Sequence, residues 1–94
     1  MSGHTCHALG CRTMVPPRLH MCAKHWRMVP RQLQRRLWAE YRPGQERDMQ
    51  PTPAYLRAVG ACVRAVAEVE GHRPDVIAIE VEMYETWATA LEAS

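Results

Sequence analysis

The segment that decides the fold runs from Cys6 to His25, CHALGCRTMVPPRLHMCAKH, because it holds two closely spaced pairs of metal-binding residues. Four residues separate Cys6 from Cys11, two separate Cys22 from His25, and ten lie between the pairs. Each pair can supply two corners of a tetrahedron from one tight turn, and three thiolates with one imidazole are a common structural zinc set. The segment also offers little apolar core in which unligated cysteines would be buried. It therefore predicts a structural Zn²⁺ ion bound by Cys6, Cys11, Cys22 and His25.

The fourth ligand is the least determined member of this set. Three further histidines lie in the same segment: His4, His7 and His20. Adjacent residues seldom bind one ion together, which disfavours His7 beside Cys6. The spacing favours His25, because Cys22-x2-His25 fits one tight turn or the entry to a helix, and His20 is the reserve. Four protein ligands close the site, so no corner remains for a catalytic water.

Length and targeting signals place the metal in context. A chain of 94 residues has room for one domain, and so short a chain buries a modest core that a metal can reinforce. Residues 1–7 contain no basic stretch followed by an apolar run, and no apolar run is long enough to cross a bilayer. We therefore expect a cytosolic protein without a membrane partner. Thiols stay reduced there, which favours a metal over disulfides.

Three helices are expected after the cysteine-rich segment. Residues 30–42 carry Leu33, Leu37, Trp38 and Tyr41 at helical spacing and end at Pro43-Gly44, after which residues 43–51 form a polar linker. Residues 53–70 follow Thr52, an expected N-cap, and stop at Gly71. The apolar stripe of this second helix is expected to comprise Tyr55, Leu56, Val59, Cys62, Val63, Val66 and Val69. Cys62 is expected to be a buried structural thiol, and Gly60 to mark close helix packing.

Residues 75–93 fit two structures. Apolar residues recur every three or four positions, which predicts a helix capped by Asp75 with one apolar face: Val76, Ile79, Met83, Trp87 and Leu91. Residues 76–83 also alternate in part like a strand, and we favour the continuous helix. His72, just before this segment, is expected to be exposed. The expected fold is mainly α in a single domain, residues 1–94, with an irregular zinc-binding knuckle (1–29) packed on about three helices (30–94).

Charge is divided unevenly along the chain. Residues 1–50 contain nine basic and three acidic residues, a balance of +6, whereas residues 51–94 contain three basic and seven acidic residues, a balance of −4. A basic region beside a zinc knuckle is typical of proteins that bind polyanions. The expected binding surface consists of Lys24, Arg27, Arg31, Arg35 and Arg42.

Catalytic machinery is largely absent from the sequence. The chain has no asparagine, only two aspartates (Asp48 and Asp75) and no Gly-rich phosphate loop. The two aspartates stand apart, so they do not form a carboxylate set for Mg²⁺. We therefore expect a protein that is not an enzyme and has no small-molecule substrate.

Several strings in the first half of the chain are distinctive: CHALGC (6–11), VPPR (15–18), MCAKHW (21–26), LW (37–38) and YRPGQE (41–46). With them the chain resembles a family of short bacteriophage and prophage proteins over roughly residues 4–56. The resemblance implies a phage setting in the cytoplasm of a bacterial host, and it implies no particular activity.

Two functions follow as expectations. The first is a zinc-binding phage accessory protein that binds nucleic acid, or a nucleic-acid-handling complex, through the basic surface; Trp26 and Trp38 would offer rings for stacking on bases. The alternative is an inhibitor of a host defence or host machinery complex, similar in action to an anti-CRISPR protein. In that case the acidic last helix, with Tyr84 and Trp87, would dock on a basic groove of the host complex.

Overall fold

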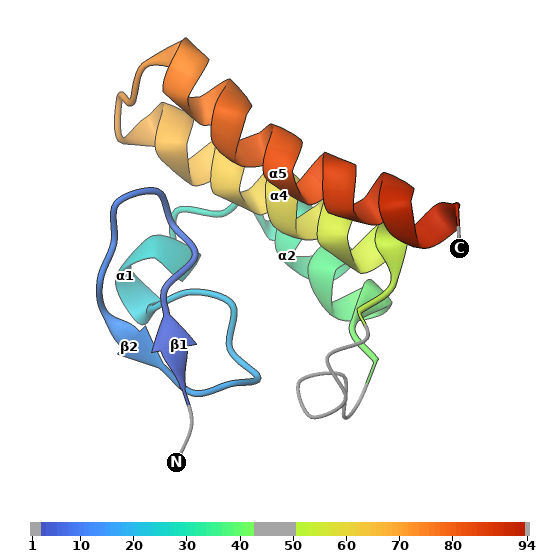
Figure 1. Ribbon diagram of the computed structural model, residues 1–94. Coiled ribbons are helices and arrows are strands. Elements are labelled where there is room, and N and C mark those ends of the chain that lie inside the picture. Colours follow the sequence, from blue (N-terminus) through green and yellow to red (C-terminus); the bar gives the residue numbers. More distant parts are fainter. Residues whose placement is uncertain (1–2, 43–50, 94) are drawn as a thin grey trace.

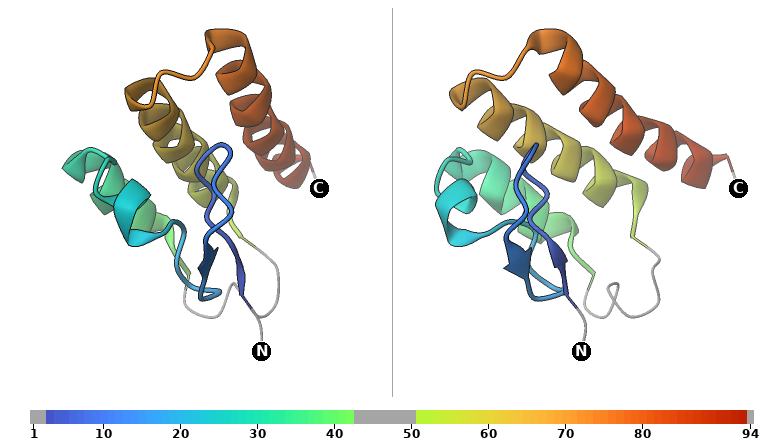
Figure 2. Two further views of the ribbon diagram at one scale, coloured as in Figure 1. Left: turned by 90° about the vertical axis from the view of Figure 1, so that its left-hand side faces the viewer. Right: turned by 60° about the vertical axis from the view of Figure 1, so that its left-hand side comes forward.

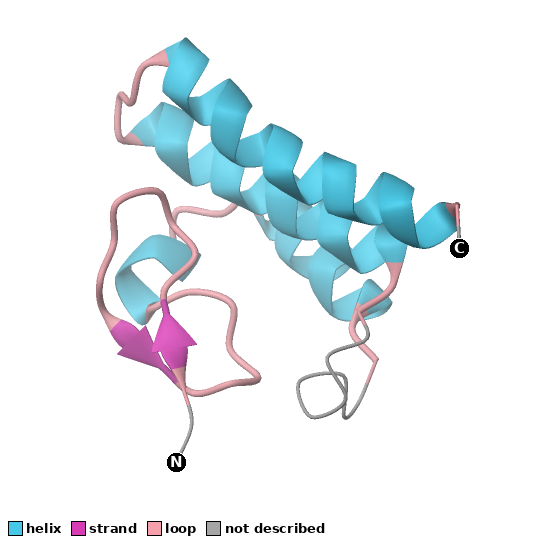
Figure 3. Ribbon diagram, in the orientation of Figure 1, coloured by secondary structure: helices cyan, strands magenta, loops and turns pink. Residues whose placement is uncertain are grey.

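The chain is described by a computed structural model that covers residues 3–42 and 51–93. In chain order its elements are β1 (His4–Thr5), β2 (Met14–Val15), α1 (Ala23–Trp26), α2 (Arg31–Glu40), α4 (Pro53–Val69) and α5 (Pro74–Glu92) (Figures 1 and 3). The expected mainly α fold with an N-terminal knuckle is confirmed. The predicted linker, residues 43–51, lies outside the described residues except for Pro51. Within the described ranges, every helix is too short or too polar to cross a bilayer.

The three longer helices lie side by side with α4 in the middle. Figure 2 shows α2 on one side of α4 and α5 on the other. The largest fully buried side chains belong to α2 and α4: Leu37, Val59, Cys62, Val63 and Val66. The core therefore lies around the central helix, and α5 is an edge helix.

Both ends of α4 follow from local signals. The Thr52 hydroxyl accepts a hydrogen bond from the backbone N–H of Tyr55 at 3.1 Å, which is an N-cap, and Pro53 occupies the first turn. At the other end Gly71 has φ +78°, and the N–H groups of His72 and Gly71 donate to the carbonyls of Ala67 and Glu68 at 3.0 and 3.2 Å. This is a Schellman motif. It reverses the chain into α5 and places Glu70 at the C-cap of α4.

Residues 74–92 form one helix, so the alternative strand at 76–83 is excluded. The helix begins at Pro74, one residue earlier than expected, with Arg73 at the N-cap position and Asp75 in the first turn. Its buried residues are Ile77, Val81, Tyr84 and Ala88. The predicted apolar face was therefore wrong, because Val76, Ile79, Met83 and Trp87 are exposed and Leu91 is half-buried.

The buried face of α5 lies against Gly60 of α4. A Cβ atom on Gly60 would lie 3.5 Å from the Cβ of Tyr84, so the backbone of α4 approaches α5 closely, as expected for this glycine. Tyr84 fits opposite the missing side chain, and Ala88 and Val81 are small enough to keep the helices close. Val69 was expected in the α4 stripe, but it stands at the last helical position and is exposed.

α2 is shorter than residues 30–42. Pro30 is its N-cap residue and Tyr41 its C-cap residue, so Tyr41 and Arg42 follow the helix instead of continuing it. Leu37 is fully buried, as expected, whereas Trp38 is 42% exposed and packs edge-on against Trp26 and Tyr41. The spacing of Arg31, Arg35 and Arg42 predicts one shared helical stripe, and this was wrong because Arg42 lies beyond the end of α2.

The N-terminal knuckle is a small hairpin followed by a single helical turn. β1 and β2 pair antiparallel in the register His4↔Val15 and Thr5↔Met14. The loop between them returns to the helices, where Leu9 packs on a cluster of Ala67, Ile77 and Val81. Four further knuckle residues belong to the main core: Cys6, Ala8, Met21 and Val29. The knuckle is thereby attached to α4 and α5 through apolar contacts.

Candidate metal centre

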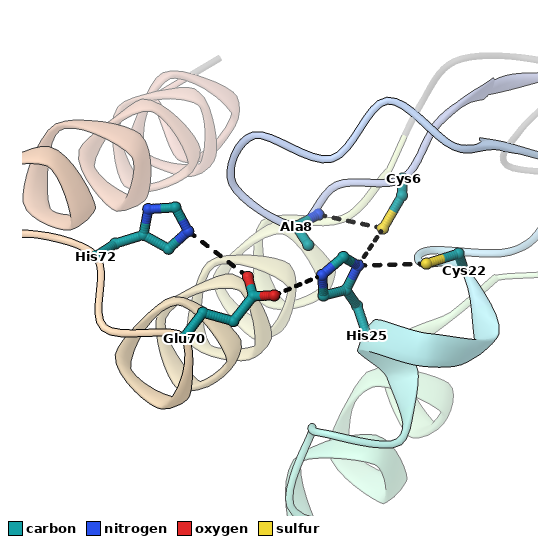
Figure 4. Close-up of polar contacts among 6 residues, drawn as sticks. All are labelled: Cys6, Ala8, Cys22, His25, Glu70 and His72. Carbon is teal, nitrogen blue, oxygen red and sulfur yellow. Dashed lines mark hydrogen bonds and ion pairs between the residues drawn. The ribbon is translucent and has the colours of Figure 1, made fainter.

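Four side chains that lie on two separate parts of the knuckle converge on one point. Cys6 and Cys11 come from the loop between the strands, Cys22 is the N-cap residue of α1, and His25 lies within α1. Their ligand atoms all lie within 4.8 Å of one another. The Nδ1 atom of His25 is 3.3 Å from the Sγ of Cys22 and 3.7 Å from that of Cys6 (Figure 4).

The two distances from His25 Nδ1 are close to those of a tetrahedral metal site. Zinc bonds of about 2.3 Å to sulfur and about 2.0 Å to nitrogen place neighbouring ligand atoms about 3.5–3.8 Å apart. The sequence predicted the same four residues, and the structure brings all four together. They form a Cys3His cluster that can hold a metal ion such as zinc.

The imidazole of His25 is oriented by a residue that sequence reasoning missed. Its Nδ1 atom faces the cysteines, and its Nε2 atom lies 2.9 Å from Oε2 of Glu70, at the C-cap of α4 (Figure 4). An Nε2–H that donates to Glu70 leaves the Nδ1 lone pair available for a metal. The sequence held one signal of this contact. A carboxylate is unfavourable at a helix C-terminus, so Glu70 at the end of the predicted second helix indicates a partner that compensates its charge.

The second oxygen of Glu70 faces another histidine. His72 Nε2 lies 3.6 Å from Glu70 Oε1, and His72 is half-buried, which corrects the expectation that it is exposed. Burial acts to raise the pKa of Glu70, but the hydrogen bond from His25 and the charges of both histidines lower it overall. Burial acts to lower the pKa of His25, yet the bonds to Glu70 and Cys22 raise it overall. Glu70 therefore favours positive charge on the His25 side of the cluster.

Hydrogen-bond donors surround the three sulfur atoms. The backbone N–H of Ala8 donates to Cys6 Sγ at 3.5 Å, although burial still raises the pKa of Cys6 to about 11. Bonds from the side chain and backbone of Thr13 lower the pKa of Cys11 to about 6. For Cys22, burial acts to raise the pKa, but bonds from the backbone and ring of His25 lower it overall. Donors to sulfur of this kind support thiolate ligands.

The reserve ligand, His20, lies outside the cluster. Its Nδ1 is 3.0 Å from Nδ1 of His7, whose ring is tilted against that of His4 with centroids 4.6 Å apart. Burial is the main cause that lowers the pKa of His7 to about 4 and that of His20 to about 3. The three histidines thus form their own group beside the metal centre, with two of them favouring the neutral form.

Four of the five predicted basic residues lie exposed on the neighbouring helices α1 and α2 or at the end of α1. Lys24 and Arg27 belong to α1 and its C-cap, Arg31 and Arg35 belong to α2, and all four are exposed. In residues 3–42 and 51–93, no ion pair within 4.0 Å is found for these four cations. Arg42 is half-buried beyond the end of α2, so it does not extend the row of Arg31 and Arg35.

A small apolar pocket adjoins these cations. Its volume is about 230 Å³, and its lining comes from the turn before α1, from α1 and from α2: Leu19, His20, Met21, Ala23, Trp26 and Trp38. The rings of Trp26 and Trp38 meet edge to face with centroids 6.4 Å apart. The pocket therefore offers aromatic surface on the same helices that carry the exposed cations.

The expected acidic surface of α5 is partly neutralised. Arg57 of α4 makes a two-bond ion pair with Glu92 at 2.7 and 2.8 Å and a further bond to Glu85 at 3.2 Å. Tyr84 is buried, so it is not part of an exposed binding face. Cys62 is fully buried, as expected, and burial raises the pKa of its thiol to about 11.

Comparisons with protein-family models, with curated proteins and with solved structures find no match to this chain. The resemblance to phage proteins accordingly stays a prediction, whereas the metal cluster rests on the geometry described above.

Proposed function

We propose that this protein is a small, non-catalytic zinc-binding protein that binds single-stranded nucleic acid, alone or within a nucleic-acid-handling complex. The observation that carries the proposal is the aromatic pocket between α1 and α2, with exposed cations on both helices. In the setting that the resemblance implies, it would be a phage accessory protein in a bacterial cytoplasm.

The cations supply affinity for the phosphate backbone. Arg31 and Arg35 lie four residues apart on α2, so their side chains project from the same face of the helix. Lys24 and Arg27 add two charges from α1. Phosphate contacts of this type are independent of sequence and weaken as salt rises.

The pocket supplies a place for a base. Trp38 is 42% exposed although it lies on a helix with a buried face, and stacking of a base on such a ring contributes roughly 1–3 kcal/mol. A duplex hides the faces of its bases, whereas a single strand presents them. The combination of exposed tryptophan and cations therefore favours a single strand over a duplex.

The metal would act as an architectural element. It would tie Cys6 and Cys11 of the hairpin loop to Cys22 and His25 of α1, and so hold α1 with its cations next to α2. Four protein ligands leave no site for a metal-bound water, which is why the proposal is non-catalytic.

The test is a fluorescence-anisotropy titration with a labelled 12-nucleotide single strand, as DNA and as RNA, and with the matching duplex. At low salt the single strand should bind, and binding should weaken steeply as NaCl rises from 50 to 200 mM. The double variant Arg31→Glu/Arg35→Glu should weaken binding at least tenfold with unchanged zinc content. Adding Arg42→Glu should have a smaller further effect, because Arg42 lies off the row.

Arg64→Glu is the matched control for the single variant Arg31→Glu, because Arg64 is an exposed arginine on α4 and each replacement changes the net charge by two. Absence of any binding at low salt would end the proposal. Equal losses in Arg64→Glu and in Arg31→Glu would also contradict it, since net charge alone would then explain the affinity.

A further inference from the structure

One face of α5 carries large apolar residues that remain substantially exposed in the described part of the chain. Val76, Ile79, Met83 and Trp87 are 38%, 70%, 51% and 44% exposed. Their spacing of three, four and four residues places them on one side of the helix, here called the α5 stripe. Figure 2 shows that α5 lies at the edge of the helical layer, next to α4. The buried residues of α5 are on its other side, so the stripe does not face α4.

The stripe is a continuous row along most of α5. It spans three helical turns, about 16 Å along the axis. Isolated exposed apolar residues are ordinary, but a continuous row of four is typical of a helix that docks on a partner. The folded core does not require the row, because α5 is held by Ile77, Val81, Tyr84 and Ala88.

The charges around the stripe indicate the chemistry of what binds there. α5 contains five acidic residues and no basic residue. Glu85 and Glu92 are paired with Arg57, and Asp75 is paired with Arg73. Glu80 and Glu82 have no ion pair within the described part of the chain.

These two glutamates border the stripe on opposite sides. At 3.6 residues per turn, Glu80 lies about 60° to one side of Met83 and Glu82 about 100° to the other. The surface is thus an apolar row between two negative borders. A complementary surface has an apolar row between positive borders.

We infer that the α5 stripe is a docking site for an amphipathic helix of a partner protein, whose apolar ridge is bordered by lysine or arginine. A second copy of this chain is a poor occupant, because pairing two α5 helices would bring their unpaired glutamates together. The site is separate from the proposed nucleic-acid surface, since α5 and α2 lie on opposite sides of α4 (Figure 2). The partner is recognised by the apolar row and by its two borders together.

The probes are two synthetic 18-residue helical peptides with one leucine ridge, bordered by lysines in the first and by glutamates in the second. Isothermal titration calorimetry with the full chain should give a dissociation constant on the order of micromolar for the lysine peptide. The glutamate peptide should bind at least tenfold more weakly. Ile79→Ser/Met83→Ser should weaken the lysine peptide at least tenfold, because it removes two anchors, with circular dichroism unchanged.

The matched control is Met14→Ser/Val69→Ser, which changes two apolar residues of similar exposure outside the stripe, 62% and 66%. It should leave peptide binding within twofold of the unmodified chain. Failure of both peptides to bind, equal binding of both, or full binding by the stripe variant would each overturn the inference. So would a dimer in sedimentation experiments that the stripe variant dissociates, because the occupant would then be a second copy.

Discussion

Glu70 should determine how tightly the cluster holds its metal, although it is 45 residues from His25 and donates no ligand atom. Glu70→Ala removes the acceptor for Nε2–H of His25. The ring then loses its orienting bond, and Nδ1 and Nε2 compete for the proton. We expect weaker zinc binding with an unchanged set of four ligands.

The size of the effect follows from the contact. The bond measures 2.9 Å and joins an imidazole to a carboxylate whose side chain is 23% exposed. A hydrogen bond to a charged group contributes about 1.5–3 kcal/mol, and partial exposure favours the lower part of this range. Glu70→Ala should therefore weaken zinc binding by about tenfold to a hundredfold. Glu70→Gln keeps an acceptor but loses the charge, so its effect should be smaller, about tenfold or less.

Competition with a chromophoric chelator measures the zinc affinity of each variant. Co²⁺ substitution reports the ligands, because the thiolate-to-metal absorption depends on the number of coordinated sulfur atoms. Glu68→Ala is the control: Glu68 is an exposed carboxylate on the same helix, two residues away. If Glu70→Ala and Glu68→Ala bind zinc equally well, the carboxylate does not orient the imidazole and the reasoning fails.

Three further outcomes are expected. Removing the metal with a chelator should abolish the near-ultraviolet circular dichroism of the knuckle and leave much of the far-ultraviolet helical signal. Native mass spectrometry should find one zinc per chain. A knuckle that keeps its near-ultraviolet signal without metal would contradict a structural ion. Gly60→Ala should raise the free energy of unfolding by up to ~1 kcal/mol, because alanine favours the helix and its Cβ makes only an ordinary contact with Tyr84. Gly60→Leu should lower the free energy of unfolding by ~1–3 kcal/mol, because the larger side chain does not fit. Denaturant titration measures both, and a destabilised alanine variant would contradict the packing of α4 on α5. Trp38→Ala should weaken single-strand binding by about fivefold or more with little loss of stability, and unchanged affinity would exclude stacking in the pocket.

Features that depend on residues close together in the sequence were predictable. Thr52, Pro53 and Gly71 define the ends of α4 through capping and backbone preferences, and these act over a few residues. The metal cluster belongs to the same class, since each ligand pair is local and only one connection between the pairs had to be inferred. The short separation of the two pairs along the chain was sufficient to infer that they bind the same ion.

The orientation of α5 was not predictable in this way. Two faces of this helix are apolar, one with Ile77 and Val81 and the other with Ile79 and Met83, so periodicity alone identifies a helix without identifying its buried side. The choice depends on the surface of α4, where Gly60 faces Tyr84 and Val81. Such a fit between distant residues leaves no pattern in either segment.

The turn at Gly71 links the metal to the helices as coupled equilibria. Glu70, Gly71 and His72 end α4 and reverse the chain, and Glu70 brings a carboxylate to His25. An ion that binds only the assembled knuckle therefore also stabilises this turn. By mass action, free zinc at a hundred times its dissociation constant would add about 2.7 kcal/mol to the assembled state. A substitution at Gly71, whose φ is +78°, should in turn lower zinc affinity from a position that touches no ligand. Zinc binding and the docking of the knuckle on α4 and α5 are therefore coupled, and each should strengthen the other.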